Sequence, residues 1–402
     1  MVDLGIVMPL YKQDFRFLKE AIQSIQSQTF KEFIAYIVVD GAPEMEPLVH
    51  ALIHTDSRFI VLRHTKNLGV AQALNTGFST LYRQETIKYL TWVSSDNVYE
   101  PSFLEIMREK LEKGPDRLGL VYSSFHTLSN SGVLLSDEFE LAALRKYQAQ
   151  PKESLLDSCI IGVSFMYKSK FAKQIEGYHM VPVEDYEYWL RLTERCDIQY
   201  IPVELMKYRV DSTFSVSSTL KTATNYRRWR YKYHLARHEA RIRRNIFPEI
   251  TLIVSVTRAD EEAVKRIENV YEQTFSNYNL VIIDASLNRQ ATRLLSSIPH
   301  PRTSFRKHAV LPRLIENYNY ISTLRTPYVM MLDAPLFKLE TDLDVLVTQL
   351  KKNDSAAANS YTETHSDVCY YHEIPNAVSL NRQNVLFRTS HLAAYLKQKG
   401  RS

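Results

Sequence analysis

Carboxylate side chains stand at three points of the chain where they could share a site. Asp40 and Asp96 each come at or just after the end of an apolar, strand-like run, and the adjacent pair Glu184-Asp185 opens a helical segment. Carboxylate oxygens are the ligands that hard divalent cations prefer. Two neighbouring carboxylates also raise each other's pKa toward values suited to proton transfer. These residue types therefore predict metal-assisted or acid–base chemistry.

The elements that would position these residues alternate between strands and helices. Buried-strand patterns cover residues 4–8, 34–39, 59–62 and 89–93, and helical spacing covers 15–28, 70–81 and 101–111. Such alternation predicts a largely parallel sheet covered by helices on both faces. Ligands of these sheets bind beyond the carboxyl ends of the strands. Tyr11, Asp40 and Asp96 fall at those ends.

Two distant stretches of the chain share one pattern. SIQSQTFKEFIAYIVVD runs from Ser24 to Asp40, and NVYEQTFSNYNLVIID runs from Asn269 to Asp284. Each consists of a helical segment, the letters QTF, an aromatic residue and a β-branched run that ends in Asp. The spacing of about 245 residues is far longer than the period of a solenoid and indicates a duplicated domain.

The composition is that of a globular protein. The 402 residues suffice for two domains, and 45% are hydrophobic and 24% charged. The formal net charge of +5 is a mild excess that favours no particular partner, and no nucleic-acid recognition module is visible, so we expect no nucleic-acid partner.

The cysteine content and the N-terminal residues favour an intracellular protein. The three cysteines, Cys159, Cys196 and Cys369, are scattered and lack metal-ligand spacing, which favours reduced thiols. The first residues enter a strand without a signal-like segment, and no apolar run approaches the ~20 residues that span a bilayer. We expect a cytoplasmic protein.

Seven stretches within the first ~220 residues carry a family resemblance. In order, they are IVMPLYKQ, AIQSIQSQTF, IVVDGAP, KNLGVAQALNTGF, SSDNVYEPSFL, VEDYEYWLRL and YRVDSTFSVS. Together they resemble the GT-A nucleotide-sugar glycosyltransferases of the family 2 type, close to those that make bacterial spore-coat polysaccharide. The resemblance implies an α/β fold with a Rossmann-like, mostly parallel mixed sheet between helices. It also implies a nucleoside-diphosphate sugar donor, a glycan acceptor and an association with the spore.

The resemblance assigns donor-binding roles to the first half of this region. Asp40 would accept the N3–H of a uracil-like base, which Pro9 and Tyr11 would cover. Asn67 and Gly69 belong to the stretch that resembles the family's N-x-G segment. Leu74 stands where many relatives carry an Arg near the diphosphate, and Arg63 or Lys66 could compensate for that missing charge. Solvated surface charge and ordinary turn residues remain the structural alternatives for these positions.

The resemblance also places a metal. Departure of a nucleoside diphosphate develops negative charge, which a divalent cation stabilises. In place of the family's D-x-D, this chain has Ser94-Ser95-Asp96. By resemblance, Asp96 holds Mn²⁺ or Mg²⁺ and Ser95 replaces an Asp that binds the ribose. Asp211 occupies the position of a metal-binding His in the family's Y-R-x-H.

Glu184-Asp185 matches the family's ED-x-x-x-W-L-R motif. By resemblance, Asp185 is the general base that deprotonates the acceptor hydroxyl in an inverting single displacement. Acidic residues also stabilise the start of a helix through the macrodipole, and this structural role is compatible with the catalytic one.

The second copy lacks part of this set. Asp284 and Asp333 match Asp40 and Asp96, but no N-x-G segment is present, and the sequence stops at Ser402 before an ED motif could occur. We expect a degenerate, truncated GT-A-like α/β domain over residues 246–402. It would be non-catalytic and serve in dimerisation, acceptor docking or partner binding.

Residues 221–245 form a basic, aromatic-rich segment that predicts a long amphipathic helix between the two copies. Three roles fit this composition. The helix could pack on a domain as a link, attach peripherally to anionic lipid, or recognise an acidic glycan.

The sequence therefore predicts a GT-A domain over residues 1–220, a basic linking helix over 221–245 and the degenerate copy beyond it. The predicted function is metal-assisted, inverting hexosyl transfer from a UDP- or TDP-sugar to a glycan. A scaffold that binds nucleotide sugar or carbohydrate without catalysis is the alternative. The reduced D-x-D favours the scaffold, and the intact Glu184-Asp185 pair opposes it.

Overall fold

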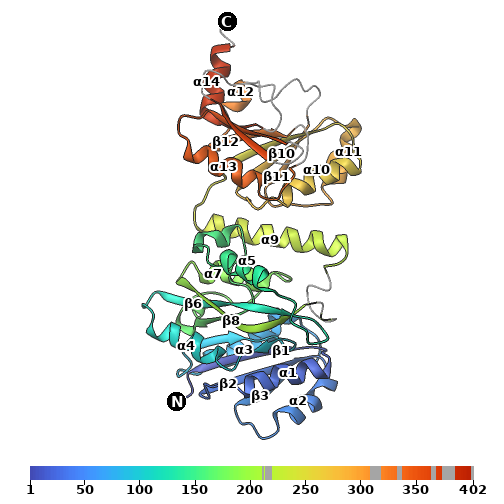
Figure 1. Ribbon diagram of the computed structural model, residues 1–402. Helices are drawn as coiled ribbons and strands as arrows, with labels where there is room; N and C mark the ends of the chain where they lie inside the picture. The colour runs from blue at the N-terminus through green and yellow to red at the C-terminus, as the bar shows by residue number, and fades with distance from the viewer. Residues whose placement is uncertain are drawn as a thin grey trace. The chain divides into compact units, whose positions relative to one another are not determined.

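The chain divides into two compact units, residues 1–236 and 237–402 (Figure 1). The structure is a computed structural model, and it describes residues 1–210, 212, 220–307, 318–332, 337–363, 368–373 and 385–399. Within these ranges, no helix is both long enough and apolar enough to cross a membrane.

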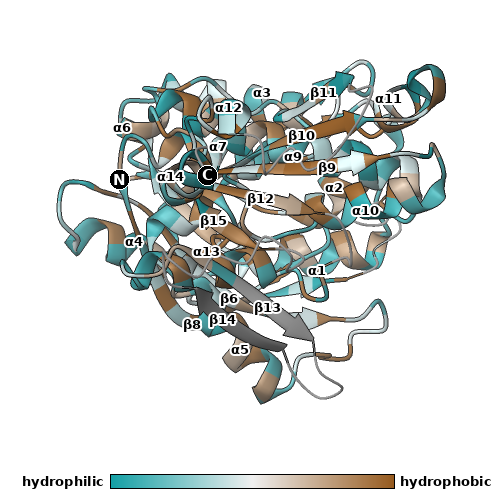
Figure 2. Cartoon of the chain, turned by 90° about the horizontal axis from the view of Figure 1, so that it is seen from above, coloured by the Kyte–Doolittle hydropathy of each residue, from teal (hydrophilic) through white to brown (hydrophobic). Residues whose placement is uncertain are grey.

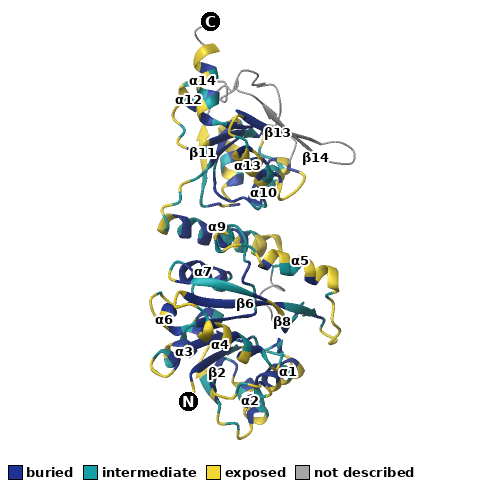
Figure 3. Ribbon diagram, turned by 60° about the vertical axis from the view of Figure 1, so that its left-hand side comes forward, coloured by how far each residue is buried: buried dark blue, intermediate teal, exposed yellow. Residues whose placement is uncertain are grey.

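The first unit contains one mixed sheet. Its strands are β1 (Leu4–Leu10), β2 (Phe33–Asp40), β3 (Phe59–His64), β4 (Tyr89–Trp92), β5 (Val98–Tyr99), β6 (Leu118–Leu128), β7 (Phe165–Lys168) and β8 (Asp197–Arg209). They lie in the order β3-β2-β1-β4-β7-β6-β8-β5. The pairs among β1 to β4 are parallel, as is β6 with β8, whereas β7 is antiparallel to both neighbours and β5 to β8. Figure 3 shows β6 in the buried interior of the unit.

Helices cover both faces of this sheet. They are α1 (Phe15–Gln26), α2 (Glu46–Ile53), α3 (Val70–Tyr82), α4 (Phe103–Lys113), α5 (Glu138–Gln148), α6 (Ser169–Ala172) and α7 (Glu184–Leu192), and α9 (Ala223–Arg243) begins in this unit. The connections through α1 and α2 step in one direction along the sheet, and the connection through α3 returns. Because such crossovers are right-handed, α3 lies on the face opposite to α1 and α2.

The packing of β1 agrees with this arrangement. Ile6 of β1 belongs to the same buried cluster as Leu18 of α1 and Val49 of α2. The adjacent Val7 points to the other face and meets Gly77 of α3, where a Cβ would lie only 2.5 Å from Val7 Cγ1. Alternate residues of one strand thus hold helices on both faces.

One asparagine joins α3 to the segment that leads into α7. Asn75 Nδ2 donates to the carbonyl of Tyr178 at 2.8 Å, and Asn75 Oδ1 accepts the Tyr178 N–H at 2.7 Å. The ring of Tyr178 stacks on Tyr188 of α7, with centroids 4.0 Å apart, and on Phe78 of α3 at 5.7 Å. Segment 176–178 is therefore held between the two helices.

The second unit repeats most of this architecture. Its strands are β9 (Ile250–Val256), β10 (Tyr278–Asp284), β11 (Thr303–Lys307), β12 (Tyr328–Leu332), β13 (Ala358–Glu363), β14 (Val368–Glu373) and β15 (Leu386–Arg388), in the order β11-β10-β9-β12-β15-β13-β14. Its helices are α10 (Glu261–Tyr271), α11 (Gln290–Leu295), α12 (Tyr318–Ile321), α13 (Asp342–Lys352) and α14 (Thr389–Lys399). Figure 2 shows the apolar colouring of β9, β10 and β12, which contribute to its core.

Six successive strands correspond between the two sheets. The order β3-β2-β1-β4-β7-β6 matches β11-β10-β9-β12-β15-β13, and each pair has the same parallel or antiparallel sense. The next strand differs, because β14 is antiparallel to β13 whereas β8 is parallel to β6. The expected fold class, a mostly parallel mixed α/β sheet followed by a second α/β sheet, is confirmed.

The shared QTF letters have a structural explanation. Gln28 Oε1 accepts the Leu104 N–H at the start of α4 at 2.9 Å, and Gln273 Oε1 accepts the Leu343 N–H at the start of α13 at 3.0 Å. Each amide also donates to a carbonyl just before that helix. Because the first N–H groups of a helix have no partner within it, this buried amide satisfies one of them in both copies.

Replacing Asn75 with Ala should destabilise the first unit by about 1–3 kcal/mol, because two hydrogen bonds between α3 and the segment before α7 are lost. Chemical denaturation measures the change. Gln72→Ala, at an exposed position of the same helix, is the matched control and should change stability by less than about 0.5 kcal/mol. Equal stability of the two variants would contradict the role given to Asn75.

Candidate functional site

A cavity of about 590 Å³ lies within the first unit. It opens beyond the carboxyl ends of β1, β2 and β4 and beside the first turns of α3 and α7. Eight of the ten predicted site residues line it, namely Pro9, Tyr11, Asp40, Asn67, Gly69, Ser95, Asp96 and Asp185. The structure thus brings the donor-binding, metal-binding and base candidates to one space.

The other two predicted residues are not placed at this cavity. The Arg63 side chain is 71% exposed, and its guanidinium pairs with Glu46 of α2 at 2.6 Å. It is absent from the residues that line the cavity. Asp211 lies outside the described residues.

The Asp40 carboxylate is held by its own chain. Oδ1 accepts the Leu68 N–H at 2.9 Å and contacts His64 Nδ1 at 2.7 Å, and Oδ2 accepts the Gly69 N–H at 2.8 Å. His64 Nε2 in turn contacts Thr76 Oγ1 of α3 at 2.9 Å. A carboxylate has about four lone-pair positions, so one position on Oδ2 remains for a ligand N–H.

Gly41 allows this arrangement. Its φ is +69°, a left-handed conformation that glycine adopts without strain. A Cβ there would lie 2.0 Å from the backbone nitrogen of Asn67. Any other residue would push the Asn67–Gly69 turn away from Asp40.

Ser95 and Asp96 form the next wall, after β4. Gln13 Nε2 donates to Ser95 Oγ at 3.3 Å. Asp96 is 9% exposed, and burial raises the pKa of its carboxyl, while a hydrogen bond from Ser212 and the charge of Arg209 oppose that rise. This is a carboxylate that a cation at the cavity would stabilise in its ionised form.

Arg209 fixes the turn that carries Asp96. Its Nε donates to the Asp96 carbonyl at 3.0 Å, Nη1 to the Ser129 carbonyl at 2.8 Å and Nη2 to Glu20 at 2.5 Å. The guanidinium also lies 3.9 Å from the ring centroid of Phe17. With 1% of its surface exposed, Arg209 supports the site rather than offering a charge to a ligand.

Asp96 is compatible with a divalent cation of the Mg²⁺ type. Such a cation takes one or two protein carboxylates and completes its coordination with substrate phosphates and water. No cluster of three His, Cys, Asp or Glu side chains is present in the described part of the chain. Asp96 is buried and lines the cavity, so it can supply one of the one or two protein carboxylates that such a cation takes.

Glu184 and Asp185 begin α7 and also line the cavity. Glu184 is 7% exposed, and its Oε2 is buried without a hydrogen-bond partner. Burial, with the charge of Asp185, raises the pKa of Glu184 to about 7. Burial also raises the pKa of Asp185, although the Tyr186 N–H donates to its Oδ1 at 2.6 Å and lowers it. A base with a raised pKa is suited to proton transfer near neutral pH.

Several lining residues were not predicted from the sequence. Lys12 and Gln13 follow β1, and Trp229 and Tyr233 come from α9. The signal for the aromatic pair is the spacing of Tyr226, Trp229 and Tyr233, which places three rings on one face of a helix.

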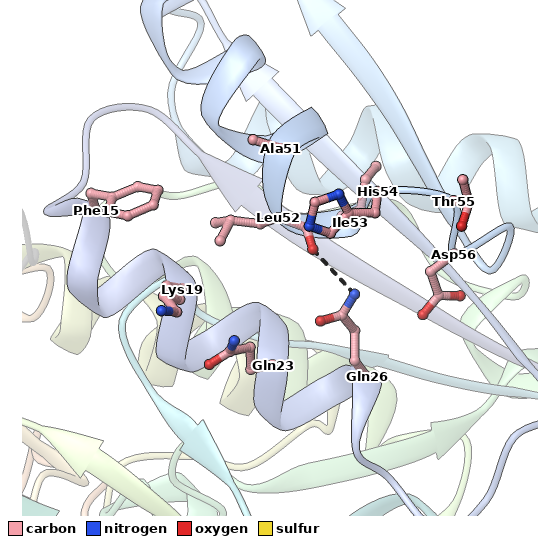
Figure 4. Close-up of a pocket in the computed structure, with 10 residues that line it drawn as sticks. All are labelled: Phe15, Lys19, Gln23, Gln26, Ala51, Leu52, Ile53, His54, Thr55 and Asp56. Atoms are coloured by element: carbon pink, nitrogen blue, oxygen red, sulfur yellow. Dashed lines mark hydrogen bonds between the residues drawn. The ribbon is translucent and has the colours of Figure 1, made fainter.

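A second hollow, of about 600 Å³, lies between α1 and the end of α2 (Figure 4). Lys19, Gln23 and Gln26 line one side, and residues 51–56 line the other. Gln26 Nε2 donates to the Leu52 carbonyl across it at 3.3 Å. None of the predicted site residues borders this hollow.

The second unit has an Asp at the position of Asp40, with a different environment. Asp284 Oδ1 accepts from both the N–H and the hydroxyl of Ser286, and Oδ2 accepts from both groups of Thr292. These four bonds use all its lone-pair positions. Asp333, the counterpart of Asp96, lies outside the described residues.

Comparison with known proteins identifies the class of the first unit. Residues 5–175 match the family model described as glycosyl transferase family 2. For these residues, the match confirms the resemblance to family 2 glycosyltransferases that was inferred from the sequence motifs.

Relatives share this part of the chain at low identity. A protein named as an uncharacterized glycosyltransferase of Methanocaldococcus jannaschii is 26% identical over 240 residues, which are 58% of this chain and 79% of the relative. One of Rickettsia bellii is 25% identical over 222 residues, 52% of this chain. The match spans only 30% of that longer protein.

Solved structures show looser similarity. TarS of S. aureus, in complex with UDP-GlcNAc, has a TM-score of 0.45 at 11% identity, covering 58% of this chain and 66% of TarS. The mannosyltransferase PcManGT of Pyrobaculum calidifontis, in complex with GDP-Man and Mn²⁺, has a TM-score of 0.43 at 17% identity. That match covers 60% of this chain and 64% of PcManGT.

Replacing Glu184 with Gln should remove a pH-dependent loss of stability. The pKa of about 7 in the folded protein lies above the ordinary 4.5, so the folded state holds a proton that the unfolded state releases. Stability should therefore fall as pH rises from about 4.5 to 7, by up to about 3 kcal/mol. Glu184→Gln should flatten this part of the profile.

Urea denaturation of wild type and variant from pH 4.5 to 8 provides the measurement. Glu153→Gln, at an exposed position, is the control and should keep the wild-type slope. A Glu184→Gln profile parallel to that of the wild type would show that Glu184 is not the titrating group.

Proposed function

We propose that the first unit transfers a sugar from a nucleoside-diphosphate sugar, UDP- or TDP-linked, to a hydroxyl group of a glycan, with inversion. One observation carries the proposal. A single cavity is lined by Asp40, Asp96 and Asp185, from three separate elements of a family 2 domain. These three positions suit contacts to the nucleobase, the diphosphate and the acceptor hydroxyl, respectively.

Asp40 and the end of β1 are proposed to hold the nucleobase. The remaining acceptor position on Asp40 Oδ2 suits the N3–H of a uracil-like base, because the neighbouring N–H groups already fix the carboxylate. Tyr11 is 42% exposed, so its ring, with Pro9, is accessible to stack on the base. Ser95 would then bond the ribose.

The diphosphate is proposed to lie beside Asp96. Asp96 would hold Mn²⁺ or Mg²⁺, which supplies charge stabilisation to the departing diphosphate. Lys12 is a further source of positive charge, because it is exposed and lines the cavity. Arg63 is 71% exposed and paired with Glu46, so we assign it no contact with the donor.

Asp185 is proposed to act as the general base. Its Oδ1 is held by the Tyr186 N–H, and Oδ2 would take the proton of the acceptor hydroxyl. As that proton leaves, the acceptor oxygen forms a bond to the anomeric carbon, and the bond from this carbon to the diphosphate oxygen breaks. Attack from the side opposite to the leaving group inverts the anomeric configuration.

We propose that the second unit takes no part in this chemistry. The Asp284 carboxylate accepts hydrogen bonds from Ser286 and Thr292 at all its lone-pair positions, so it has no position left to accept an N–H of a nucleobase. The functional layout is then a catalytic domain over 1–220, a basic linking helix over 221–245 and a non-catalytic domain over 246–402. A docking or dimerisation role suits the last of these.

A nucleotide-sugar-binding scaffold without turnover is the second candidate. The observation that favours it is the Ser94-Ser95-Asp96 turn, which offers one carboxylate where the family motif has two. Nucleotide binding without transfer would be its signature.

Asp185→Asn should reduce turnover of nucleotide sugars by at least about 100-fold, since general-base catalysis contributes 10²–10⁴-fold. Nucleotide binding should change less than threefold, because Asp185 lies on the acceptor side. Binding of UDP, TDP and GDP with and without Mn²⁺ is measured by thermal shift, and turnover by release of nucleoside diphosphate.

Asp185→Glu, which keeps a carboxylate, should retain more turnover than Asp185→Asn. Nucleotide binding without turnover of any donor in the wild type would favour the scaffold. Failure of every nucleotide to bind would exclude both candidates.

The two copies provide a matched pair of variants for nucleotide binding. Asp40→Asn should weaken the nucleotide at least tenfold, since the amide cannot reproduce the carboxylate acceptor. Asp284→Asn disturbs an equally buried carboxylate in the second unit and should leave the affinity unchanged. Isothermal titration measures the nucleotide affinity of both variants. Equal losses of affinity would contradict the proposal that Asp40 binds the nucleobase.

A further inference from the structure

We infer that a row of aromatic side chains from α9 is a subsite for an extended oligosaccharide acceptor, and this inference rests on the proposed function. The row consists of Tyr226, Trp229 and Tyr233 of α9, followed by Tyr186 of α7. Successive ring centroids are 5.6, 5.0 and 4.4 Å apart. All four residues belong to the first unit.

The helix period produces this row. Tyr226, Trp229 and Tyr233 are spaced by three and four residues, so they occupy one face of α9. The guanidinium of the buried Arg230 lies 5.8 Å from the Tyr226 ring centroid and supports the outer end of the row. The rings therefore have a fixed order from Tyr226 inward to Tyr186.

The rings are offset rather than eclipsed. The planes of Trp229 and Tyr233 are only 15° from parallel, yet their centroids are 5.0 Å apart. Parallel rings in contact are separated by about 3.5 Å, so the lateral offset is about 3–4 Å. An offset of this size leaves part of each face uncovered by the next ring.

The row leads to the proposed base. Trp229, Tyr233 and Tyr186 line the same cavity as Asp185, and Tyr186 is the next residue after Asp185. At the other end, Tyr226 is 36% exposed. Tyr186, at the inner end, is only 2% exposed, so the three rings of α9 are those that can meet an acceptor, and they lead from solvent toward the residue that would deprotonate it.

The chemistry of the row selects a sugar chain. A pyranose ring presents a face of C–H groups, which packs on the electron-rich face of an aromatic ring, while its hydroxyl groups stay in water at the edge. Several rings in a line offer several such contacts. The acceptor is therefore inferred to be an oligosaccharide or polysaccharide end, bound through more than its terminal sugar.

Binding to an array of neutral hexasaccharides tests this inference in the full-length chain. The array carries glucose, galactose, mannose, N-acetylglucosamine and rhamnose hexamers together with the matching monosaccharides. At least one hexamer should bind more than about tenfold tighter than its monosaccharide, because it can contact more than one ring of the row. Titration then gives the affinity for that hexamer.

Variants locate the subsite. Trp229→Ala and Tyr233→Ala should each weaken the hexamer about tenfold, and Trp229→Phe, which keeps a flat ring, should lose less than threefold. Arg228→Ala is the matched control, because Arg228 is exposed on the same helix and does not line the cavity. Its affinity for the hexamer should equal that of the wild type.

Titration with UDP, TDP and GDP in the presence of Mn²⁺ distinguishes failure of the proposed function from failure of the acceptor subsite. Failure of every nucleotide to bind overturns the proposed function. Nucleotide binding with no hexamer bound, or with Trp229→Ala binding as the wild type does, overturns the acceptor subsite alone. So does preferential binding to anionic phospholipid vesicles. If Trp229→Ala loses both ligands through misfolding, Trp229→Phe decides, and loss of the hexamer in that variant overturns the inference.

Discussion

The geometry of the cavity depends on the two hydrogen bonds between Asn75 and the backbone of Tyr178. Asn75 lies on α3, which begins beside Asp40, and Tyr178 precedes α7, which begins with the proposed base. Arg191 of α7 adds bonds to the carbonyls of residues 176 and 177 and a buried ion pair with Glu187. Because one short segment is bonded to both helices, their first turns are fixed relative to each other. Removing the two hydrogen bonds of Asn75 would therefore loosen the donor side and the acceptor side of the cavity together.

The duplication separates what the fold requires from what the chemistry requires. Gln28 and Gln273 perform the same structural task, since each accepts one N–H at the start of a helix. The aspartates differ, because Asp40 keeps one acceptor position toward a cavity whereas Asp284 is enclosed by two hydroxyl-bearing neighbours. A repeated pattern in the sequence thus reports a shared scaffold. The function depends on the few residues that surround an equivalent side chain.

The sequence predicted the strands and the cavity walls because these follow from local signals. Apolar runs gave β1, β2 and β3 to within two residues, and the residues after those runs came together as parallel strands demand. Arg63 shows the limit of what local sequence signals can predict. Its place on β3 was predictable, but Glu46 of α2, which pairs with it, is close only in the fold. Trp229 and Tyr233 depend in the same way on where α9 packs.

The Glu184-Asp185 pair shows how one helix start can serve two needs. The positive end of a helix dipole stabilises ionised carboxylates and lowers their pKa, which alone would make a weak base. Burial acts in the opposite direction and is the larger effect at both residues, so the pKa of each is raised. The charge of Asp185 adds to the rise in the pKa of Glu184, whose Oε2 is buried without a hydrogen-bond partner. A carboxyl group left unsatisfied in this way costs stability, and the fold retains it beside the proposed base.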